Sequence, residues 1–226
     1  MDGQDFEQIE SYGSERWLGE LAEELRNKTY QPNAVRRVFI PKPNGKQGPL
    51  GIPTIRDRVV QAAAVLVLAP IFEADLASEQ YAYRAGCSAL DAVRQVHEWV
   101  NRGRSEVVDA DLSDYFNTIP HSQLMKSVAR RISDRHILRL IRMWLVVRVE
   151  EDDGRGGVRR TTHHKDAGRG ISQGAPISLL LSNLYMRRLV LGWKVLGYES
   201  GLQARVVNYA DDRAPRGRGK EAEMVT

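Results

Sequence analysis

Residues 106–112 read Glu-Val-Val-Asp-Ala-Asp-Leu, and residues 203–209 read Gln-Ala-Arg-Val-Val-Asn-Tyr. The first segment alternates apolar and acidic residues and the second is rich in β-branched residues, so both are predicted to be strands. Asp111 lies on the polar face of the first strand, and Asp211 and Asp212 directly follow the second. If the two strands are neighbours, three carboxylates meet at one end of a sheet.

Three converging carboxylates favour a magnesium site. Mg²⁺ prefers hard oxygen ligands, and two such ions can activate an attacking hydroxyl and stabilise a leaving phosphate oxygen. A structural interpretation stands beside this one, because adjacent aspartates after a strand are often only turn chemistry.

The rest of the chain mixes helices and strands without steady alternation, which favours an α+β fold. A strand is expected at 35–40, followed by a hairpin or loop over 41–53. The helix at 57–72 is apolar on nearly all sides and is expected to be buried. Further helices are predicted at 14–28, 88–100, around 124–128, 137–144 and 178–195.

The composition restricts the partners and the cellular compartment that are expected for the protein. The chain has 226 residues, and its 33 Lys and Arg against 29 Asp and Glu give a net charge of +4. This mild basicity permits a nucleic-acid partner without requiring one. The single cysteine, Cys87, excludes an internal disulfide and fits a reducing compartment. No signal peptide or apolar run long enough to span a bilayer is visible, so a cytoplasmic protein without membrane contact is expected.

Five sequence blocks, in this order, resemble the bacterial group II intron-type reverse transcriptases. The resemblance runs from about Tyr30 to Asp212. The blocks are RRVFIPKPNGKQGPLGIPTIRDRVVQ (36–61), YRAGCSALDAV (83–93), VVDADLSDYFNTIPH (107–121), ISQGAPISLLLSNLYM (171–186) and VVNYADD (206–212).

The resemblance implies the α+β fold of a right-hand polymerase, with fingers and palm but no thumb. It implies an N-terminal helical segment over 1–29, fingers over 30–105 and a palm over 106–226. Part of the fingers is expected to return near 133–170, and the palm is expected to be truncated after the Tyr-Ala-Asp-Asp turn.

The resemblance also assigns the catalytic metal site. Asp111, Asp211 and Asp212 match the catalytic aspartates, and the backbone carbonyl of Leu112 completes a metal shell. The implied cofactor is a pair of Mg²⁺ ions. The implied partners are an RNA template, a DNA primer and deoxynucleoside triphosphates, with an intron RNA as a further candidate.

A nucleotide site is implied by five other residues. Phe116 matches a ring beneath the incoming sugar, Gln173 and Gly174 match a segment that lines the nucleotide pocket, and Lys42 and Lys46 are placed to meet triphosphate oxygens. Without the family, Phe116 would be interpreted as a core aromatic and the two lysines as part of a solvated loop.

Basic and aromatic residues suggest where nucleic acid binds. Arg56 and Arg58 are candidates for phosphate contacts, Tyr83 for base stacking, and Arg84 lies beside it in the second block. Taken singly, such residues are more often hydrated surface features.

Departures from the family leave two hypotheses open. Gly48 stands where the family has a triphosphate-binding arginine, and residues 213–220 lack the pattern of the apolar strand that follows the aspartate pair. Further departures are Ala85, Cys87, Ser172 and Leu179. These changes and the absent thumb predict a poor polymerase. The chain is therefore either an RNA-directed DNA polymerase or a truncated, non-catalytic RNA-binding remnant of one.

Overall fold

A computed structural model describes residues 4–41, 45, 47–104, 106–110, 112, 114–153 and 157–210. The chain divides into two compact units, one formed by Met1–Ile71 with Phe116–Leu181 and the other by Phe72–Tyr115 with Ser182–Thr226. The described elements are α1 (Phe6–Tyr12), α2 (Ser14–Arg26), β1 (Val35–Pro41), β2 (Gln47–Ile52), α3 (Ile55–Glu73), α4 (Ala89–Asn101), α5 (Tyr115–Thr118), α6 (His121–Ala129), α7 (Arg135–Leu145), β3 (Val149–Asp152), β4 (Val158–Thr161), α8 (His163–Ala167), α9 (Pro176–Val195) and α10 (Tyr198–Gly201). The mixture confirms the predicted α+β class.

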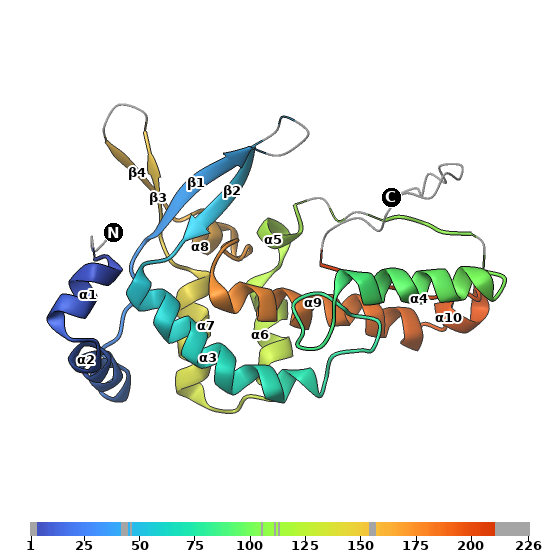
Figure 1. Cartoon of the computed structure of the whole chain (residues 1–226), viewed down its shortest axis with the longest axis horizontal. Helices are drawn as coiled ribbons and strands as arrows, with labels where there is room; N and C mark the ends of the chain where they lie inside the picture. Colours follow the sequence, from blue (N-terminus) through green and yellow to red (C-terminus); the bar gives the residue numbers. More distant parts are fainter. Residues whose placement is uncertain are drawn as a thin grey trace. The chain divides into compact units, whose positions relative to one another are not determined.

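A four-stranded sheet in the first unit has the order β2-β1-β3-β4. Strands β1 and β2 are antiparallel, with Ile40 opposite Gly48, and this confirms the predicted strand and hairpin. Strands β3 and β4 form a second hairpin, and β1 pairs with β3 in parallel. Figure 1 shows the two hairpins standing above the helices of this unit.

The buried carboxylate of Asp57 connects the segment before β1 to α3 and, through Tyr30, to α7. Asp57, in the first turn of α3, accepts hydrogen bonds from the Tyr30 hydroxyl at 2.6 Å, the Thr54 hydroxyl at 2.8 Å and the Asn33 backbone N–H at 3.0 Å. The indole N–H of Trp144 on α7 donates to the Tyr30 oxygen at 3.2 Å. Burial and the hydrogen bond to Asp57 raise the pKa of Tyr30 well above its ordinary value, so its hydroxyl remains a donor.

Helix α3 is less buried than its composition predicts. Leu68 and Phe72 are buried, but Leu66 and Val67 are 78% and 63% exposed. A helix with apolar residues on nearly all sides does not specify which face packs, so the sequence did not indicate that Leu66 and Val67 would be exposed. In the described part of the chain, no helix has the length and apolarity needed to cross a membrane.

The second unit contains α4, the last turns of α9, and α10. Helix α4 begins with the predicted capping box, in which the Ser88 hydroxyl and the Asp91 carboxylate each accept from the other residue's backbone N–H. The fully buried Gln80 donates to the Asn183 carbonyl at 2.9 Å, and the Asn183 side chain donates to the Ala82 carbonyl. These bonds join the chain after α3 to α9.

The two predicted palm strands are not formed. Residues 106–110 and Leu112 have no regular structure, and 203–209 contain only an isolated bridge between Asn208 and Gln80. Val107 and Val108 are 54% and 66% exposed. A strand needs a neighbour to satisfy its backbone groups, and strand propensity alone does not supply one.

Candidate nucleotide site and nucleic-acid interface

The predicted catalytic aspartates and fingers lysines lie outside the residues that the structure describes. The convergence of Asp111, Asp211 and Asp212, and the placement of Lys42 and Lys46, therefore stay predictions. Leu112 is described and is 41% exposed. Within the described ranges, no group of three or more His, Cys, Asp or Glu residues is arranged to hold a metal ion.

The structure does link Phe116 to Gln173 and Gly174, through residues 170–174, here called the 170–174 segment. The Ile171 N–H donates to the Phe116 carbonyl at 2.8 Å. The Gln173 carbonyl accepts from the Gly51 N–H at 2.6 Å. One short segment therefore connects α5, which carries Phe116, to β2 of the hairpin.

The N-terminal end of the segment is held by His121, the first residue of α6, and by Ile119, two residues before it. The Gly170 N–H donates to the Ile119 carbonyl at 2.9 Å. His121 Nε2 lies 2.7 Å from the Gly170 carbonyl oxygen. Because a carbonyl can only accept, Nε2 carries the proton of this hydrogen bond.

Three glycines allow these close approaches. A Cβ on Gly174, which has a φ of +96°, would lie 2.8 Å from the Gly51 carbonyl oxygen and from Leu50. A Cβ on Gly51 would lie 2.9 Å from Val35. A Cβ on Gly170, with a φ of +99°, would lie 2.6 Å from the His164 ring. Real Cβ atoms do not fit at such distances, so the backbone contacts depend on glycine.

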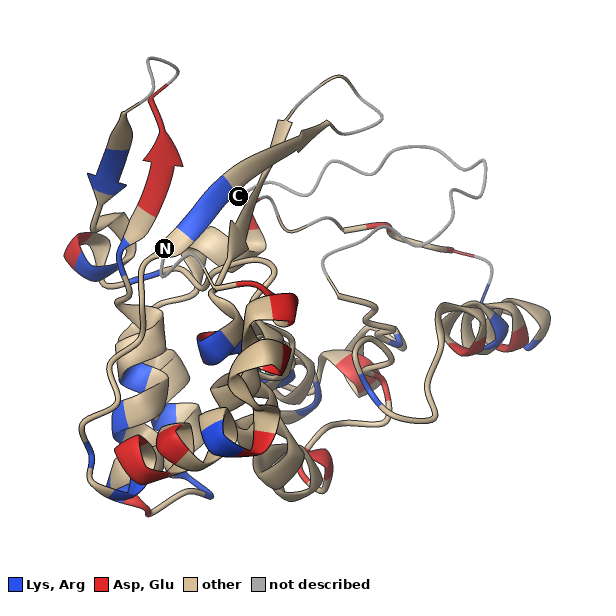
Figure 2. Ribbon diagram, turned by 60° about the vertical axis from the view of Figure 1, so that its left-hand side comes forward, with Lys and Arg blue, Asp and Glu red and all other residues tan. Residues whose placement is uncertain are grey.

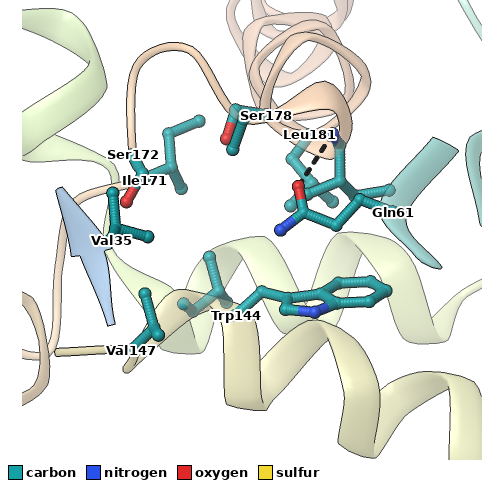
Figure 3. Close-up of a pocket in the computed structure, with 11 residues that line it drawn as sticks. Val35, Gln61, Trp144, Val147, Ile171, Ser172, Ser178 and Leu181 are labelled. Atoms are coloured by element: carbon teal, nitrogen blue, oxygen red, sulfur yellow. Dashed lines mark hydrogen bonds between the residues drawn. The ribbon is translucent and has the colours of Figure 1, made fainter. Parts of the chain in front are cut away.

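The helix that follows the segment is anchored to α3. The side-chain oxygen of Gln61, on α3, accepts from the Ile177 N–H at 3.5 Å, in the first turn of α9. Figure 3 shows Gln61, Trp144 and Val35 around a small cavity next to Ser172. Its volume of about 10 Å³ is that of roughly one water, so it belongs to the packing beneath the segment and cannot hold a nucleotide.

A second cavity of about 10 Å³ lies on the sheet side of the segment. Its lining includes Arg37, Asn117, Gln173 and His164. His164, on α8, is 3% exposed, and its Nε2 has no hydrogen-bond partner among the atoms described. Burial, then the charge of Arg37, lowers the pKa of His164 to about 4, so its ring is neutral near pH 7.

Two of the four predicted nucleic-acid contacts are engaged within the protein. The Arg56 guanidinium pairs with the Glu24 carboxylate, donates to the Gln31 carbonyl at 3.1 Å and lies 4.8 Å from the centre of the Tyr30 ring. Its side chain is 18% exposed. The role of Arg56 in binding nucleic acid remains a prediction, and its contacts assign it a structural role.

Arg84 is held in a similar way. Its guanidinium pairs with the Glu73 carboxylate at 2.5 Å and donates to the backbone carbonyls of Ala77 and Gln80 at 2.7 and 2.6 Å. Only 12% of its side chain is exposed. These bonds close the turn after α3, whereas a phosphate contact by Arg84 remains a prediction.

The other two candidates differ in exposure, because Arg58 is half-buried and its Nε is buried without a hydrogen-bond partner among the described atoms. The Arg58 guanidinium lies 5.9 Å from the centre of the Phe6 ring. Tyr83 is 46% exposed and has a φ of +56° in the left-handed region. Base stacking by Tyr83 remains a prediction.

Sequence reasoning did not find His164, Gly170 or Gly51. His164 lies in a polar stretch with no periodic pattern, and nothing in the sequence marks it as buried. The glycines resemble ordinary turn residues until the atoms facing their Cα are known. The run from Gly168 to Gly174, with three glycines in seven residues, was the one available signal of close backbone packing.

Replacement of Gly170 by alanine is predicted to destabilise the protein more than the same change at Gly168. Both positions have positive φ, but a Cβ on Gly168 meets nothing within 4 Å. Gly168→Ala should cost about 1–2 kcal/mol from the left-handed backbone. Gly170→Ala adds overpacking against His164, for a total of roughly 2–5 kcal/mol. Urea unfolding of the two variants measures the difference, and equal losses would contradict the contact.

His164 is predicted to make the protein lose stability as the pH falls. Its pKa is about 6.5 when unfolded and about 4 when folded, so between these values the unfolded chain binds more protons. The loss should approach about 3 kcal/mol at pH 4 and increase little below it. In His164→Leu this component should disappear, whereas His163→Gln, at the exposed neighbouring histidine, should retain it. Unfolding free energies at pH 4 to 7 provide the measurement, and identical pH profiles for the two variants would rule out the assignment.

Comparison with known proteins identifies the family. Residues 40–221 match the family model of reverse transcriptase (RNA-dependent DNA polymerase). Protein YkfC of Escherichia coli (strain K12) is 42% identical over 171 residues, which cover 74% of this chain and 42% of that protein. The group II intron-encoded protein LtrA of Lactococcus lactis subsp. cremoris is 29% identical, over 78% of this chain and 28% of LtrA.

The chain therefore spans less than half of these relatives' length. A chain of the partial Cas6-RT-Cas1–Cas2 complex has a similar fold, with a TM-score of 0.54 and 24% identity. The match covers 88% of this chain and 32% of that one, and it concerns the fold alone. Since the family model covers most of the sequence, the chain belongs to the reverse transcriptase (RNA-dependent DNA polymerase) family and contains its fingers–palm region, with group II intron-encoded reverse transcriptases among its homologues.

Proposed function

We propose that this chain copies RNA into DNA, as an RNA-directed DNA polymerase of the group II intron type. It binds an RNA template, a DNA primer and deoxynucleoside triphosphates, and an intron RNA is a further partner. The observation that carries the proposal is the backbone link through the 170–174 segment. It ties Phe116 to Gln173 and Gly174, the described residues expected to form the nucleotide pocket.

Enzymes of this family act on nucleic-acid templates and primers and use divalent metal ions. In the proposed site, Asp111, Asp211, Asp212 and the Leu112 carbonyl hold two Mg²⁺ ions, for which this all-oxygen donor set is suited. Bound Mg²⁺ lowers the pKa of a primer hydroxyl and stabilises charge on the leaving pyrophosphate.

The protein's own residues position the nucleotide. Lys42 and Lys46 attract the triphosphate, and the backbone of Gln173 and Gly174 forms one wall of the pocket. The Phe116 ring lies beneath the sugar and excludes a 2′-hydroxyl. Phe116 is 5% exposed, which suits both this role and a core aromatic.

A second function, RNA binding without catalysis, is favoured by one specific observation. Gly48 lies in β2 opposite Ile40, within the hairpin proposed to meet the triphosphate. Glycine supplies no cation there, whereas an arginine would add charge-assisted hydrogen bonds.

Primer extension on an RNA template with Mg²⁺ tests the proposal. Weak extension is expected from this chain, and Asp111→Asn should reduce it by a factor of about 10²–10³, the equivalent of several kcal/mol of lost metal stabilisation. Asp109→Asn, an exposed carboxylate in the same segment, is the matched control and should leave the rate unchanged.

The Gly48→Arg variant tests the missing cation in the same assay. A charged hydrogen bond is worth about 1.5–3 kcal/mol, so triphosphate affinity should rise by roughly 10- to 150-fold. No extension by any variant, with RNA binding retained, would establish the non-catalytic alternative.

Replacement of Phe116 is predicted to relax the choice of sugar. Phe116→Leu and Phe116→Ala should raise the ratio of ribonucleotide to deoxynucleotide use, because space opens for the 2′-hydroxyl. Ile119→Ala is the control, since Ile119 is 1% exposed and its truncation also leaves a core cavity. The ratio is measured by single-nucleotide incorporation or, without extension, by equilibrium binding of the two triphosphates. An unchanged ratio would return Phe116 to the role of a core aromatic.

A further inference from the structure

Helix α7 carries a row of exposed arginines. Arg135, Arg139 and Arg142 are spaced four and three residues apart, so they lie on one face of the helix. The opposite face buries Ile141, Trp144 and Leu145. Figure 2 marks the positions of Lys and Arg in blue along the ribbon. Arg135, Arg139 and Arg142 are called the α7 stripe below.

Among the described residues, the α7 stripe has no carboxylate partner, unlike the exposed arginines of α2 and α4, whereas the exposed Arg188 of α9 lies 5.8 Å from the centre of the Tyr185 ring. Arg16, Arg94 and Arg102 each pair with an acidic side chain one turn away, Arg16 with Glu20 at 3.1 Å and Arg94 with Asp91 at 2.9 Å. Over the part of the chain that is described, no ion pair within 4.0 Å involves a residue of the stripe.

Basic residues also outnumber acidic residues in the sequence around the stripe. Between residues 121 and 149 the chain has seven Lys or Arg and one acidic residue, Asp134. The Asp134 carboxylate caps α7, accepting from the backbone N–H groups of His136 at 2.7 Å and Ile137 at 3.0 Å. These hydrogen bonds lower the pKa of Asp134, so it stays charged in this role.

Of the three arginines, only Arg142, in the last turn of α7, is placed favourably for the helix dipole. Like charges at positions i and i+4, such as Arg135 and Arg139, repel each other. Arg135 is also the first residue of α7, where the positive end of the helix dipole disfavours a cation. A local rule broken without a structural gain points to function.

We propose that the α7 stripe binds the phosphate backbone of RNA, at a surface separate from the nucleotide pocket. Guanidinium groups bind phosphates through paired hydrogen bonds, and a helical rise of about 1.5 Å per residue spaces these three about 6 and 4.5 Å apart along the axis. Arg130, exposed in the turn before α7, extends the positive charge.

RNA is favoured over a membrane because the apolar residues of α7 are buried or half-buried, and none is exposed for insertion into lipid. The choice of RNA over DNA rests on the proposed function, in which RNA is the template. A row of arginines on one helix recognises backbone rather than sequence.

The test compares two triple variants of the full chain with equal net charge. Arg135→Gln/Arg139→Gln/Arg142→Gln removes the stripe, and Arg16→Gln/Arg94→Gln/Arg102→Gln removes three paired arginines. Affinity for single-stranded RNA is measured over a range of salt concentrations. The stripe variant should lose about 2 units of the slope of log affinity against log salt, at about 0.7 per phosphate contact. The control variant should retain the slope, and replacing the stripe by three lysines should restore it.

Equal losses in the two variants would reduce the effect to net charge and overturn the proposal. Selective loss of binding to DNA duplex or to phosphatidylserine vesicles, with RNA binding intact, would also overturn it. Triphosphate binding and extension are measured on the same variants. Failure of those activities with the RNA effect preserved refutes the polymerase function alone, whereas an unchanged RNA slope with extension preserved refutes the stripe alone.

Discussion

The close backbone packing of the 170–174 segment is the constraint on which the described site depends. The segment contacts β2 through Gly51, α5 through Phe116 and the start of α6 through His121. The contacts at Gly51, Gly170 and Gly174 require glycine, because a Cβ at each of these positions would lie within 3 Å of a neighbouring atom. Because hydrogen bonds on both sides hold the segment, its position cannot change without breaking several of them. The nucleotide pocket proposed on this segment would therefore be preorganised by the backbone.

The hydrogen bonds of the buried Asp57 carboxylate stabilise the same unit of the protein. Asp57 joins the chain before β1 to α3, and Tyr30 joins both to α7 through Trp144. A buried carboxylate is costly unless its oxygens are satisfied, and here three donors from one local region do so. Gln61 lies one turn after Asp57 on α3 and accepts a hydrogen bond from the first turn of α9. Helix α3 therefore holds both the segment before β1 and the helix that follows the 170–174 segment. The positions of the sheet and of the 170–174 segment thus both depend on α3.

Much of this architecture follows from sequence, and the failures have physical causes. The β1–β2 hairpin, the capping box of α4 and the extent of α9 were predictable because local signals specify them: a central Asn-Gly, a Ser-x-x-Asp pair and a long apolar run. The strands at 106–112 and 203–209 were wrong because pairing depends on a distant neighbour that alternation cannot reveal. The exposed face of α3 and the burial of His164 were also invisible, since both depend on which other elements pack there. Of the site, sequence supplied the candidates Phe116, Gln173 and Gly174, and the structure supplied the backbone link between them.

Arginines show why composition alone cannot locate a nucleic-acid surface in this protein. Arg56, Arg84 and Arg139 contribute equally to the net charge. Arg56 and Arg84, however, have carboxylate and carbonyl partners that stabilise the fold. A guanidinium already neutralised by Glu24 or Glu73 must lose that partner before it can bind a phosphate, so its net contribution to affinity is small. An exposed guanidinium without such a partner exchanges only water and counterions, and the release of counterions from the nucleic acid drives association. The number of arginines without carboxylate partners is therefore a better guide to polyanion binding than the net charge of +4.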